Sequence, residues 1–262
     1  MKSVRLGCVK YLNARPLIRG WRGNVEFDHP SALCQRLAKG ELDVALVSSF
    51  EFLRNPIYRI VDDVSISSDG PVYSVVVAHR GEFSKIEEIE LDPASETAVN
   101  LLRCLLAELW LTPRLTGGGS DKAGSARTRL IIGDQAIRFR QNRADGYQFL
   151  DLGEQWKKLT GLPFVYALWL IRPEVPDAKS IAQRLRGLRD ENLANIPAIA
   201  SEAVADVADS KQVITQKFLD RYYHEYLRFG FGTLEKQGLQ TFADLCAKHE
   251  VLPKRVCEFS LV

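Results

Sequence analysis

The segment that decides the fold is Val4–Leu17, with the sequence V-R-L-G-C-V-K-Y-L-N-A-R-P-L. The apolar residues up to Val9 form a short run that is typical of a buried parallel strand. Pro16 predicts the start of a helix, since proline fits the first helical turn, where its missing N–H is no loss. The loop between them, Lys10–Arg15, is therefore expected at the carboxyl end of the first strand of an α/β sheet, where open sheets bind ligands.

Asn13 and Arg15 give this loop an amide and a guanidinium that can face a ligand crevice. The same spacing also fits an ordinary strand-to-helix turn in which Asn13 is only a local cap. The residues of the loop leave both interpretations open.

The overall composition is that of an ordinary globular protein. The chain has 262 residues, of which 46% are hydrophobic and 26% are charged, and its net charge is +2. Because this charge is small and the basic residues are scattered, we expect no nucleic-acid partner. No apolar run approaches the roughly 20 residues that a membrane-spanning helix needs, and no signal-peptide core follows Met1. We therefore expect no membrane role.

The cysteines and histidines indicate neither disulfides nor a metal site. The five cysteines are odd in number, far apart and never in a C-x-x-C pair, which is typical of reduced thiols in a cytoplasmic protein. None of the four histidines has a metal-ligand spacing. The sequence thus predicts a cytoplasmic protein without a bound metal.

The segments after the opening loop predict a parallel strand-helix-strand unit. Val25–Phe27 is expected to be a strand, Pro30–Leu37 a helix and Asp43–Val47 a buried strand. Right-handed crossovers bring the ends of parallel strands to one edge of a sheet. Ser48, which follows the last of these strands, is therefore expected on the same side as Asn13.

A turn-rich segment, Ser65–Pro71, precedes the long apolar strand Tyr73–Ala78. Ser74 is therefore expected inside a regular element, which holds a functional side chain more firmly than a loop does. A lone serine on a strand is also common as a small packing residue. The pattern alone leaves the role of Ser74 open.

A helix with a polar start is predicted after Asp92. Leucines up to Leu109 recur at helical spacing, and Ser95 or Asp92 is expected to cap the helix. Ser95 and Thr97 stand at this N-terminus, whose free N–H groups suit a carboxylate. An ordinary capped helix without a ligand fits the same residues.

Two long apolar segments suggest how the chain is divided. Leu162–Leu170 is similar to Tyr73–Ala78 in length and character, and we expect the two strands to lie side by side and to cross between two lobes. The chain between them would form an inserted second lobe, and such double crossings act as hinges that close on a ligand. Within this lobe, Thr112–Arg129 is expected to be a flexible surface loop, and Leu130–Ile132 a strand that ends at Gly133.

The last third of the chain is predicted to be helical. Apolar residues recur at helical spacing in Ile181–Leu188, Ser210–Leu227 and Thr233–Leu245. In the middle segment, Phe218, Tyr222 and Tyr226 form a stripe that is typical of a helix face packed on the core rather than of a cofactor site.

Several segments, in order along the whole chain, resemble the chorismate dehydratases, the family that opens the futalosine route to menaquinone. They are Tyr11–Leu17, Gly40–Ser48, Ser67–Val75, Ile132–Asp134, Asp151–Trp156, Thr160–Val165 and Tyr226–Phe242. The resemblance implies an α/β fold like that of type II periplasmic binding proteins, with two lobes and two crossing hinge strands. Residues 1–77 and 170–262 would form a discontinuous first lobe with the C-terminal helices, and residues 78–169 the inserted second lobe.

The resemblance also implies an activity and a site. The activity is that of a carbon–oxygen lyase, which eliminates water from chorismate to give 3-[(1-carboxyvinyl)oxy]benzoate without a cofactor, in a cytoplasmic monomer or homodimer. The family's functional pair, the asparagine of the Y-L-N motif and the serine after G-P-V-x, corresponds here to Asn13 and Ser74. The substrate-binding positions would be Tyr11, Arg15, Ser48, Ser68, Gly70, Ser95, Thr97 and Gly133.

At the start of the helix after Ser95 the chain departs from this family. Glu96 and Ala98 stand where an arginine and a serine are usual. An acidic side chain beside a carboxylate site would repel the ligand unless it points outward.

A rival interpretation keeps the fold without the catalysis. A non-catalytic cytoplasmic protein that binds a small anion would have the same architecture, since fold alone does not define function. The sister enzyme that makes dihydroxynaphthoate also shares the fold, but the Y-L-N-A-R-P opening at Tyr11–Pro16 fits it less well.

Overall fold

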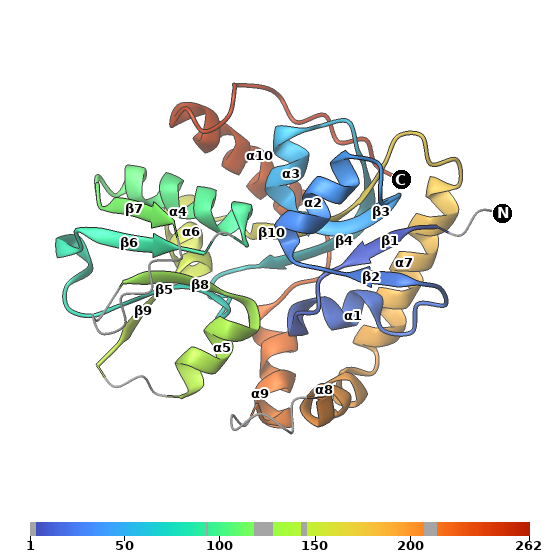
Figure 1. Cartoon of the computed structure of the whole chain (residues 1–262), viewed down its shortest axis with the longest axis horizontal. Helices are drawn as coiled ribbons and strands as arrows, with labels where there is room; N and C mark the ends of the chain where they lie inside the picture. Colours follow the sequence, from blue (N-terminus) through green and yellow to red (C-terminus); the bar gives the residue numbers. More distant parts are fainter. Residues whose placement is uncertain (1–3, 93, 118–127, 143–145, 207–213) are drawn as a thin grey trace.

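Two lobes, each built around a five-stranded sheet, make up the structure, which is a computed structural model of the chain (Figure 1). It describes residues 4–92, 94–117, 128–142, 146–206 and 214–262. The strand order is β2-β1-β3-β10-β4 in the first sheet and β7-β6-β8-β5-β9 in the second. Helices pack on both sheets, which confirms the expected two-lobed α/β architecture.

The first lobe starts with the parallel unit that the sequence predicts. Its elements are β1 (Leu6–Cys8), η1 (Leu12–Ala14), α1 (Arg15–Ile18), β2 (Val25–Phe27), α2 (Pro30–Ala38), β3 (Val44–Ser48) and α3 (Ser49–Arg54). β1 pairs in parallel with both β2 and β3. Because these strands point the same way, Asn13 in η1 and Ser48 at the end of β3 lie at one edge of the sheet.

Two long antiparallel strands complete the first sheet. β10 (Phe164–Ile171) lies between β3 and β4 (Arg59–Ser68). The expected pairing of Leu162–Leu170 with Tyr73–Ala78 is wrong, because β5 (Val75–His79) pairs with β8 and β9 of the second sheet. The partner of β10 at the hinge is therefore β4.

The serine-rich stretch Ser65–Ser68 was expected to be part of a turn-rich segment, but it is the buried end of β4. A segment near the C-terminus pairs with it: the backbone N–H groups of Ser67 and Arg228 donate to each other's carbonyls at 2.9 and 2.8 Å. The Ser65 hydroxyl donates to the Gly230 carbonyl. Since Arg228 lies 161 residues from Ser67, the local sequence could not show these partners.

The second lobe surrounds β5. Its other elements are η2 (Phe83–Lys85), β6 (Glu88–Leu91), α4 (Glu96–Glu108), β7 (Arg114–Gly117), β8 (Arg129–Ile132), α5 (Gly133–Gln141), β9 (Gln148–Asp151) and α6 (Leu152–Thr160). The prediction of a loop over Thr112–Arg129 is wrong at its start, because β7 pairs in parallel with β6. The rest of the Gly-rich stretch, residues 118–127, lies outside the described residues.

The chain passes from one sheet to the other at two places. The first is the segment after β4, residues 69–74, and the second is the short turn between α6 and β10. Sheet membership assigns residues 75–77 to the second lobe and 164–169 to the first. We therefore propose that the lobe borders lie at these crossings. They are a few residues away from the borders that the resemblance implies, which follow residues 77 and 169.

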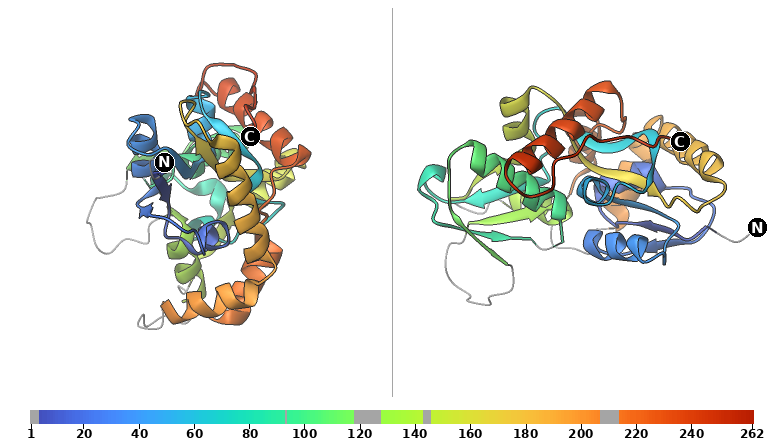
Figure 2. Two further views of the ribbon diagram at one scale, coloured as in Figure 1. Left: turned by 90° about the vertical axis from the view of Figure 1, so that its right-hand side faces the viewer. Right: turned by 90° about the horizontal axis from the view of Figure 1, so that it is seen from above.

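The C-terminal elements hold the two lobes together. They are α7 (Ala178–Leu193), α8 (Ile196–Asp206), α9 (Gln216–Arg221), the π-helical turn η3 (Tyr222–Tyr226) and α10 (Thr233–Lys248). α7 packs along the first lobe, whereas α10 lies across the top of both lobes (Figure 2) and contacts β10 and α4. Thr215 caps α9 by accepting the N–H of Phe218 at 3.1 Å; the expected cap, Ser210, lies outside the described residues.

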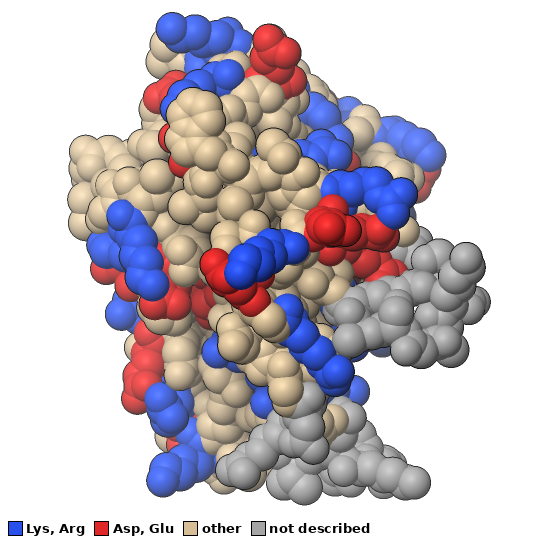
Figure 3. All heavy atoms as spheres, turned by 90° about the vertical axis from the view of Figure 1, so that its left-hand side faces the viewer, with Lys and Arg blue, Asp and Glu red and all other residues tan. Residues whose placement is uncertain are grey.

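The charged side chains at the end of the second lobe are of both signs. Basic and acidic side chains alternate on this face without a single-sign patch (Figure 3). Within the described part of the chain, no helix combines the length and the apolar character that a membrane crossing requires.

Candidate active site

A cavity of about 70 Å³ lies between the lobes. The first lobe contributes residues that follow β1 and β3, and the second lobe contributes the starts of β5, α4 and α5. Among the lining residues are the sequence-predicted positions Tyr11, Asn13, Ser48, Ser74, Ser95, Thr97 and Gly133. The structure thus brings most of the predicted site together.

Asn13 presents an unused acceptor at this cavity. It lies in η1, and no side-chain hydrogen bond caps η1 or α1, so its interpretation as a local cap is wrong. Its Oδ1 is buried without a hydrogen-bond partner among the described residues. A buried oxygen in this state costs about 1–3 kcal/mol, a cost that a bound ligand with a donor group would remove.

Ser74 lies directly before β5 rather than inside it. The residue is buried, and its Oγ accepts the phenol O–H of Tyr222 at 2.7 Å. Its carbonyl accepts the N–H of Gly133 at 2.7 Å. Both bonds join Ser74 to other elements, so its position is fixed from two sides.

The residue before Ser74 has a strained backbone. Tyr73 has φ +67°, in the left-handed region that is unfavourable for a residue with a side chain. Its N–H donates to Asp151 Oδ2 at 2.8 Å, and its carbonyl accepts Arg140 Nη1 at 2.9 Å. The Arg140 guanidinium also lies 3.9 Å from the centre of the Tyr73 ring. These contacts hold the turn that presents Ser74.

Direct contacts across the cavity keep the lobes closed. The hydroxyls of Ser48 in the first lobe and Thr97 in the second are hydrogen-bonded. The N–H of Leu12 donates to Asp134 Oδ1 at 3.0 Å. Burial raises the pKa of this Asp134 carboxyl, and the bond from Leu12 opposes the shift only in part.

Gly133 allows the closest approach between the lobes. Its φ is +58°, and a Cβ built there would lie 3.3 Å from the Tyr11 ring. Glycine alone adopts this conformation without strain. The absence of a side chain therefore lets the aromatic ring of the first lobe rest on the start of α5.

The cavity is suited to a negatively charged ligand although no lysine, arginine or histidine lines it among the described residues. α4 and α5 both begin at it, after Ser95 and at Gly133. Helix N-termini carry free N–H groups and a partial positive charge, which stabilise anions. The Ser95 hydroxyl accepts the Ala98 N–H at 3.2 Å, so its own proton adds a neutral donor. Carboxylates would be bound here by N–H and O–H groups rather than by cations.

Three predicted positions lie outside the cavity lining. Arg15 forms an ion pair of 2.7 Å with Asp206, so it is not the expected anchor inside the cavity. The Ser68 hydroxyl donates to the Gly70 carbonyl at 3.0 Å and bonds to the Tyr166 hydroxyl at 3.1 Å. Because Tyr166 does line the cavity, Ser68 and Gly70 support the site from behind it.

The sequence interpretation missed two tyrosines of the site. Tyr166 is hidden in the apolar run of β10, and Tyr222 in the aromatic stripe that was assigned to the core. Tyr222 is indeed fully buried, so the core assignment is confirmed, but its hydroxyl also reaches Ser74. A polar tip on a buried aromatic ring is the one local signal that could have indicated this.

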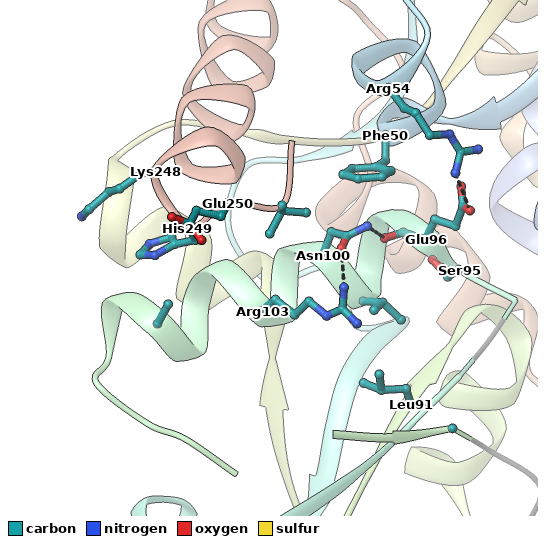
Figure 4. A pocket seen from close by; sticks show the side chains of 14 residues that line it. Phe50, Arg54, Leu91, Ser95, Glu96, Asn100, Arg103, Lys248, His249 and Glu250 are labelled. Carbon is teal, nitrogen blue, oxygen red and sulfur yellow. Dashed lines mark hydrogen bonds and ion pairs between the residues drawn. The ribbon is translucent and has the colours of Figure 1, made fainter. Parts of the chain in front are cut away.

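A larger hollow of about 940 Å³ lies on the outer side of α4, facing α3 and α10 (Figure 4). Arg54 Nη1 pairs there with Glu96 Oε1 at 2.8 Å, and Arg54 also pairs with the buried Glu51. The Glu96 side chain therefore points away from the cavity between the lobes, so this departure from the family pattern adds no negative charge to the lining.

A metal ion does not fit the buried cluster beside this hollow. Ligand atoms of Cys34, Glu51 and Glu96 lie within 4.8 Å of one another. However, the guanidinium of Arg54 already pairs with both carboxylates, so these oxygens are engaged and not free to bind a cation.

The two lobes and the cavity between them are those of the class of two-lobed binding-protein folds, and solved structures of this class are similar to the chain. A solved protein from Archaeoglobus fulgidus, AF1704, is similar with a TM-score of 0.73 and 15% identity, covering 95% of this chain and 98% of that chain. The periplasmic aliphatic sulphonate binding protein SsuA from Escherichia coli is similar with a TM-score of 0.69 and 14% identity, covering 98% and 96%. At these identities the likeness shows the fold alone.

Residues 4–248 match the menaquinone biosynthesis family, and the chain belongs to this family. It is 29% identical over 266 residues to the chorismate dehydratase of Thermus thermophilus, covering 93% of this chain and 95% of the relative. It is 26% identical over 239 residues to the chorismate dehydratase of Campylobacter jejuni, covering 90% of each. The resemblance seen in the sequence is confirmed at the level of the family.

Proposed function

We propose that this protein is a chorismate dehydratase that acts in the futalosine route to menaquinone. The observation that carries the proposal is the cavity lined by Asn13 and Ser74, where Asn13 Oδ1 has no partner in the described part of the chain. The names of the similar curated proteins and the family support the same reaction. A biosynthetic role also agrees with the cytoplasmic location expected from the sequence.

The reaction is an elimination that makes a ring aromatic. The C3–H and C4–O bonds of chorismate break, a ring double bond forms, and the proton and hydroxide leave as water to give 3-[(1-carboxyvinyl)oxy]benzoate. Aromatisation supplies the driving force. The protein therefore has to bind a dianion, align the two breaking bonds and stabilise the charge that develops.

The lining residues divide these tasks. Asn13 would hydrogen-bond and orient the reacting part of the ring, and Ser74 would donate to the departing hydroxyl or to a carboxylate. The donors at the starts of α4 and α5 would hold the carboxylates. Neither a histidine nor a carboxylate lines the cavity among the described residues, and an amide is too weakly basic to take a carbon-bound proton. The enolpyruvyl carboxylate of the substrate itself would act as the base.

The direct test is to incubate the purified protein with chorismate and to follow the aromatic product by chromatography. Repeated turnover by the wild-type protein, and its loss in Ser74→Ala, would support the proposal. Tight binding of chorismate without any product would instead identify a non-catalytic binding protein of the same fold. Neither binding nor product would reject both functions.

A further inference from the structure

The π-helical turn η3 contains two buried tyrosines that contact the two halves of the candidate site. The Leu227 N–H donates to the Tyr222 carbonyl at 3.2 Å, and this five-residue spacing makes the turn π-helical. Such turns are rare and often lie at functional sites. Tyr222 and Tyr223 begin the turn, and both are buried.

Each phenol makes one hydrogen bond to the site. Tyr222 donates to Ser74 Oγ at 2.7 Å, and Tyr223 donates to the Leu12 carbonyl at 2.9 Å. Leu12 directly precedes Asn13 in η1. Adjacent residues of a helix point in different directions, so one turn can reach the first lobe with one phenol and the crossing segment beside β5 with the other.

The protonation state of the phenols limits what they can do. Burial raises the pKa of Tyr222 well above its ordinary value, and it raises the pKa of Tyr223 in the same direction. Both therefore stay protonated and act as donors. Because the proton of Tyr222 is used on Ser74 Oγ, the serine's own proton is free to be donated to a ligand. Loss of the Tyr222 proton would leave a buried phenolate, so Tyr222 is not the acid of the reaction.

We propose that Tyr222 and Tyr223 are positioning residues for the elimination: Tyr222 fixes Ser74 as a donor, and Tyr223 fixes the turn that carries Asn13. The inference rests on the proposed function and deepens it, since it assigns the geometry of both functional residues to one π-helical turn.

The first test is Tyr222→Phe, which keeps the ring in the core and removes only the hydroxyl. We expect kcat to fall about ten- to a hundredfold, as a misplaced reacting group does, with KM little changed. Tyr226→Phe is the matched control, because it lies in the same turn and its hydroxyl accepts only Arg221 Nη2, at 3.2 Å, among the hydrogen bonds of the described residues. Thermal unfolding of each variant shows that the comparison is made on folded protein.

A crossed double-mutant cycle separates positioning from a general structural role. Tyr222→Phe should have little further effect in a Ser74→Ala background but its full effect in an Asn13→Ala background. Tyr223→Phe should show the reverse pattern. Product affinity, measured by calorimetry, gives a second reading of the same cycle for variants that turn over too slowly. Losses that add equally in both backgrounds would overturn the inference.

The outcomes for the inference and for the function differ. A wild-type protein that makes no product rejects the proposed function and the inference with it. An active wild type in which Tyr222→Phe matches Tyr226→Phe rejects the inference alone. If Tyr222→Phe does not fold at the assay temperature, the Tyr223→Phe half of the cycle decides: coupling to Asn13 supports the inference, and equal losses in both backgrounds reject it.

Discussion

Asn13 lines the cavity and keeps a buried amide oxygen that has no hydrogen-bond partner among the described residues. Most buried polar groups in proteins are paired, so an exception needs a physical reason. The reason proposed here is that the substrate supplies the missing partner. The free protein then carries a small cost in stability that disappears when the ligand binds.

Asn13→Ala is expected to lower kcat by about a hundred- to a thousandfold, the effect of removing one preorganised polar group from an active site. Chorismate affinity should change much less, because the carboxylates are held by other donors. Steady-state kinetics and calorimetry measure the two quantities. The exposed Asn24→Ala is the control, and a near-normal kcat in Asn13→Ala would contradict its role.

Single residues also show where reasoning from the sequence succeeds and where it fails. The loop pattern marked Asn13, but the family resemblance was needed to choose a functional role over a cap. Arg15 was assigned to the cavity because arginine suits carboxylates, yet its partner Asp206 is 191 residues away. A local pattern cannot show such a partner, nor the bond of Tyr222 to Ser74 across 148 residues.

Among the elements, the parallel unit β1–β3 was predictable because its strands, helices and turns follow one another in the chain. The hinge was not. The apolar runs of β5 and β10 indicate burial on both faces but not which strand lies beside which. β4 was missed because serines Ser65, Ser67 and Ser68 suggest a turn, although their buried hydroxyls all find backbone partners.

The close contact between Gly133, at the start of α5, and the Tyr11 ring can be tested by adding one methyl group at position 133. Gly133→Ala would place a Cβ against the Tyr11 ring at 3.3 Å, in a backbone with φ +58°. We expect it to lower the free energy of unfolding by about 1–2 kcal/mol through backbone strain and to raise KM, because the lobes cannot close fully. Denaturant unfolding and steady-state kinetics measure the two effects.

Gly161→Ala provides the control for this strain. Gly161 ends α6 with φ +72°, and nothing lies within 4 Å of the position of its Cβ. It should lose similar stability without any change in KM. Equal KM values for the two variants would show that the contact of Tyr11 with Gly133 does not matter for substrate binding.

Across the whole molecule, several contacts join the two lobes, among them Ser48 with Thr97 and Leu12 with Asp134 at the cavity, and Arg54 with Glu96 on the outer side of α4. The third lies at the edge of the outer hollow in Figure 4 and includes the buried Glu51. Removal of one partner of a buried ion pair is costly, since it leaves a charge without compensation.

Arg54→Met is therefore expected to lower the free energy of unfolding by about 1–2 kcal/mol near pH 8, less than for a fully buried pair because the Arg54 side chain is 43% exposed. Burial raises the pKa of Glu51 above its ordinary 4.5, and Arg54 opposes this shift. Without Arg54 the carboxyl takes up a proton more easily in the folded state. The stability of the variant should therefore recover as the pH falls toward 4.5 and decline as the pH rises through the raised pKa.

Urea unfolding at several pH values measures this dependence. The double variant Arg54→Met/Glu51→Gln, which has no charge at position 51, should lack most of the loss and its pH dependence. A loss in Arg54→Met that stays constant across this range would mean that Glu51 is not the group responsible.

The central claim is that a doubly negative ring acid binds between the lobes, against Asn13 and the starts of α4 and α5. A crystal structure of the Ser74→Ala variant with chorismate tests it most directly. The account predicts the ring in the cavity between the lobes, with the Asn13 amide within hydrogen-bond distance of the reacting ring and a carboxylate at a helix start. Chorismate bound in the outer hollow beside Arg54, or elsewhere on the surface, would contradict it.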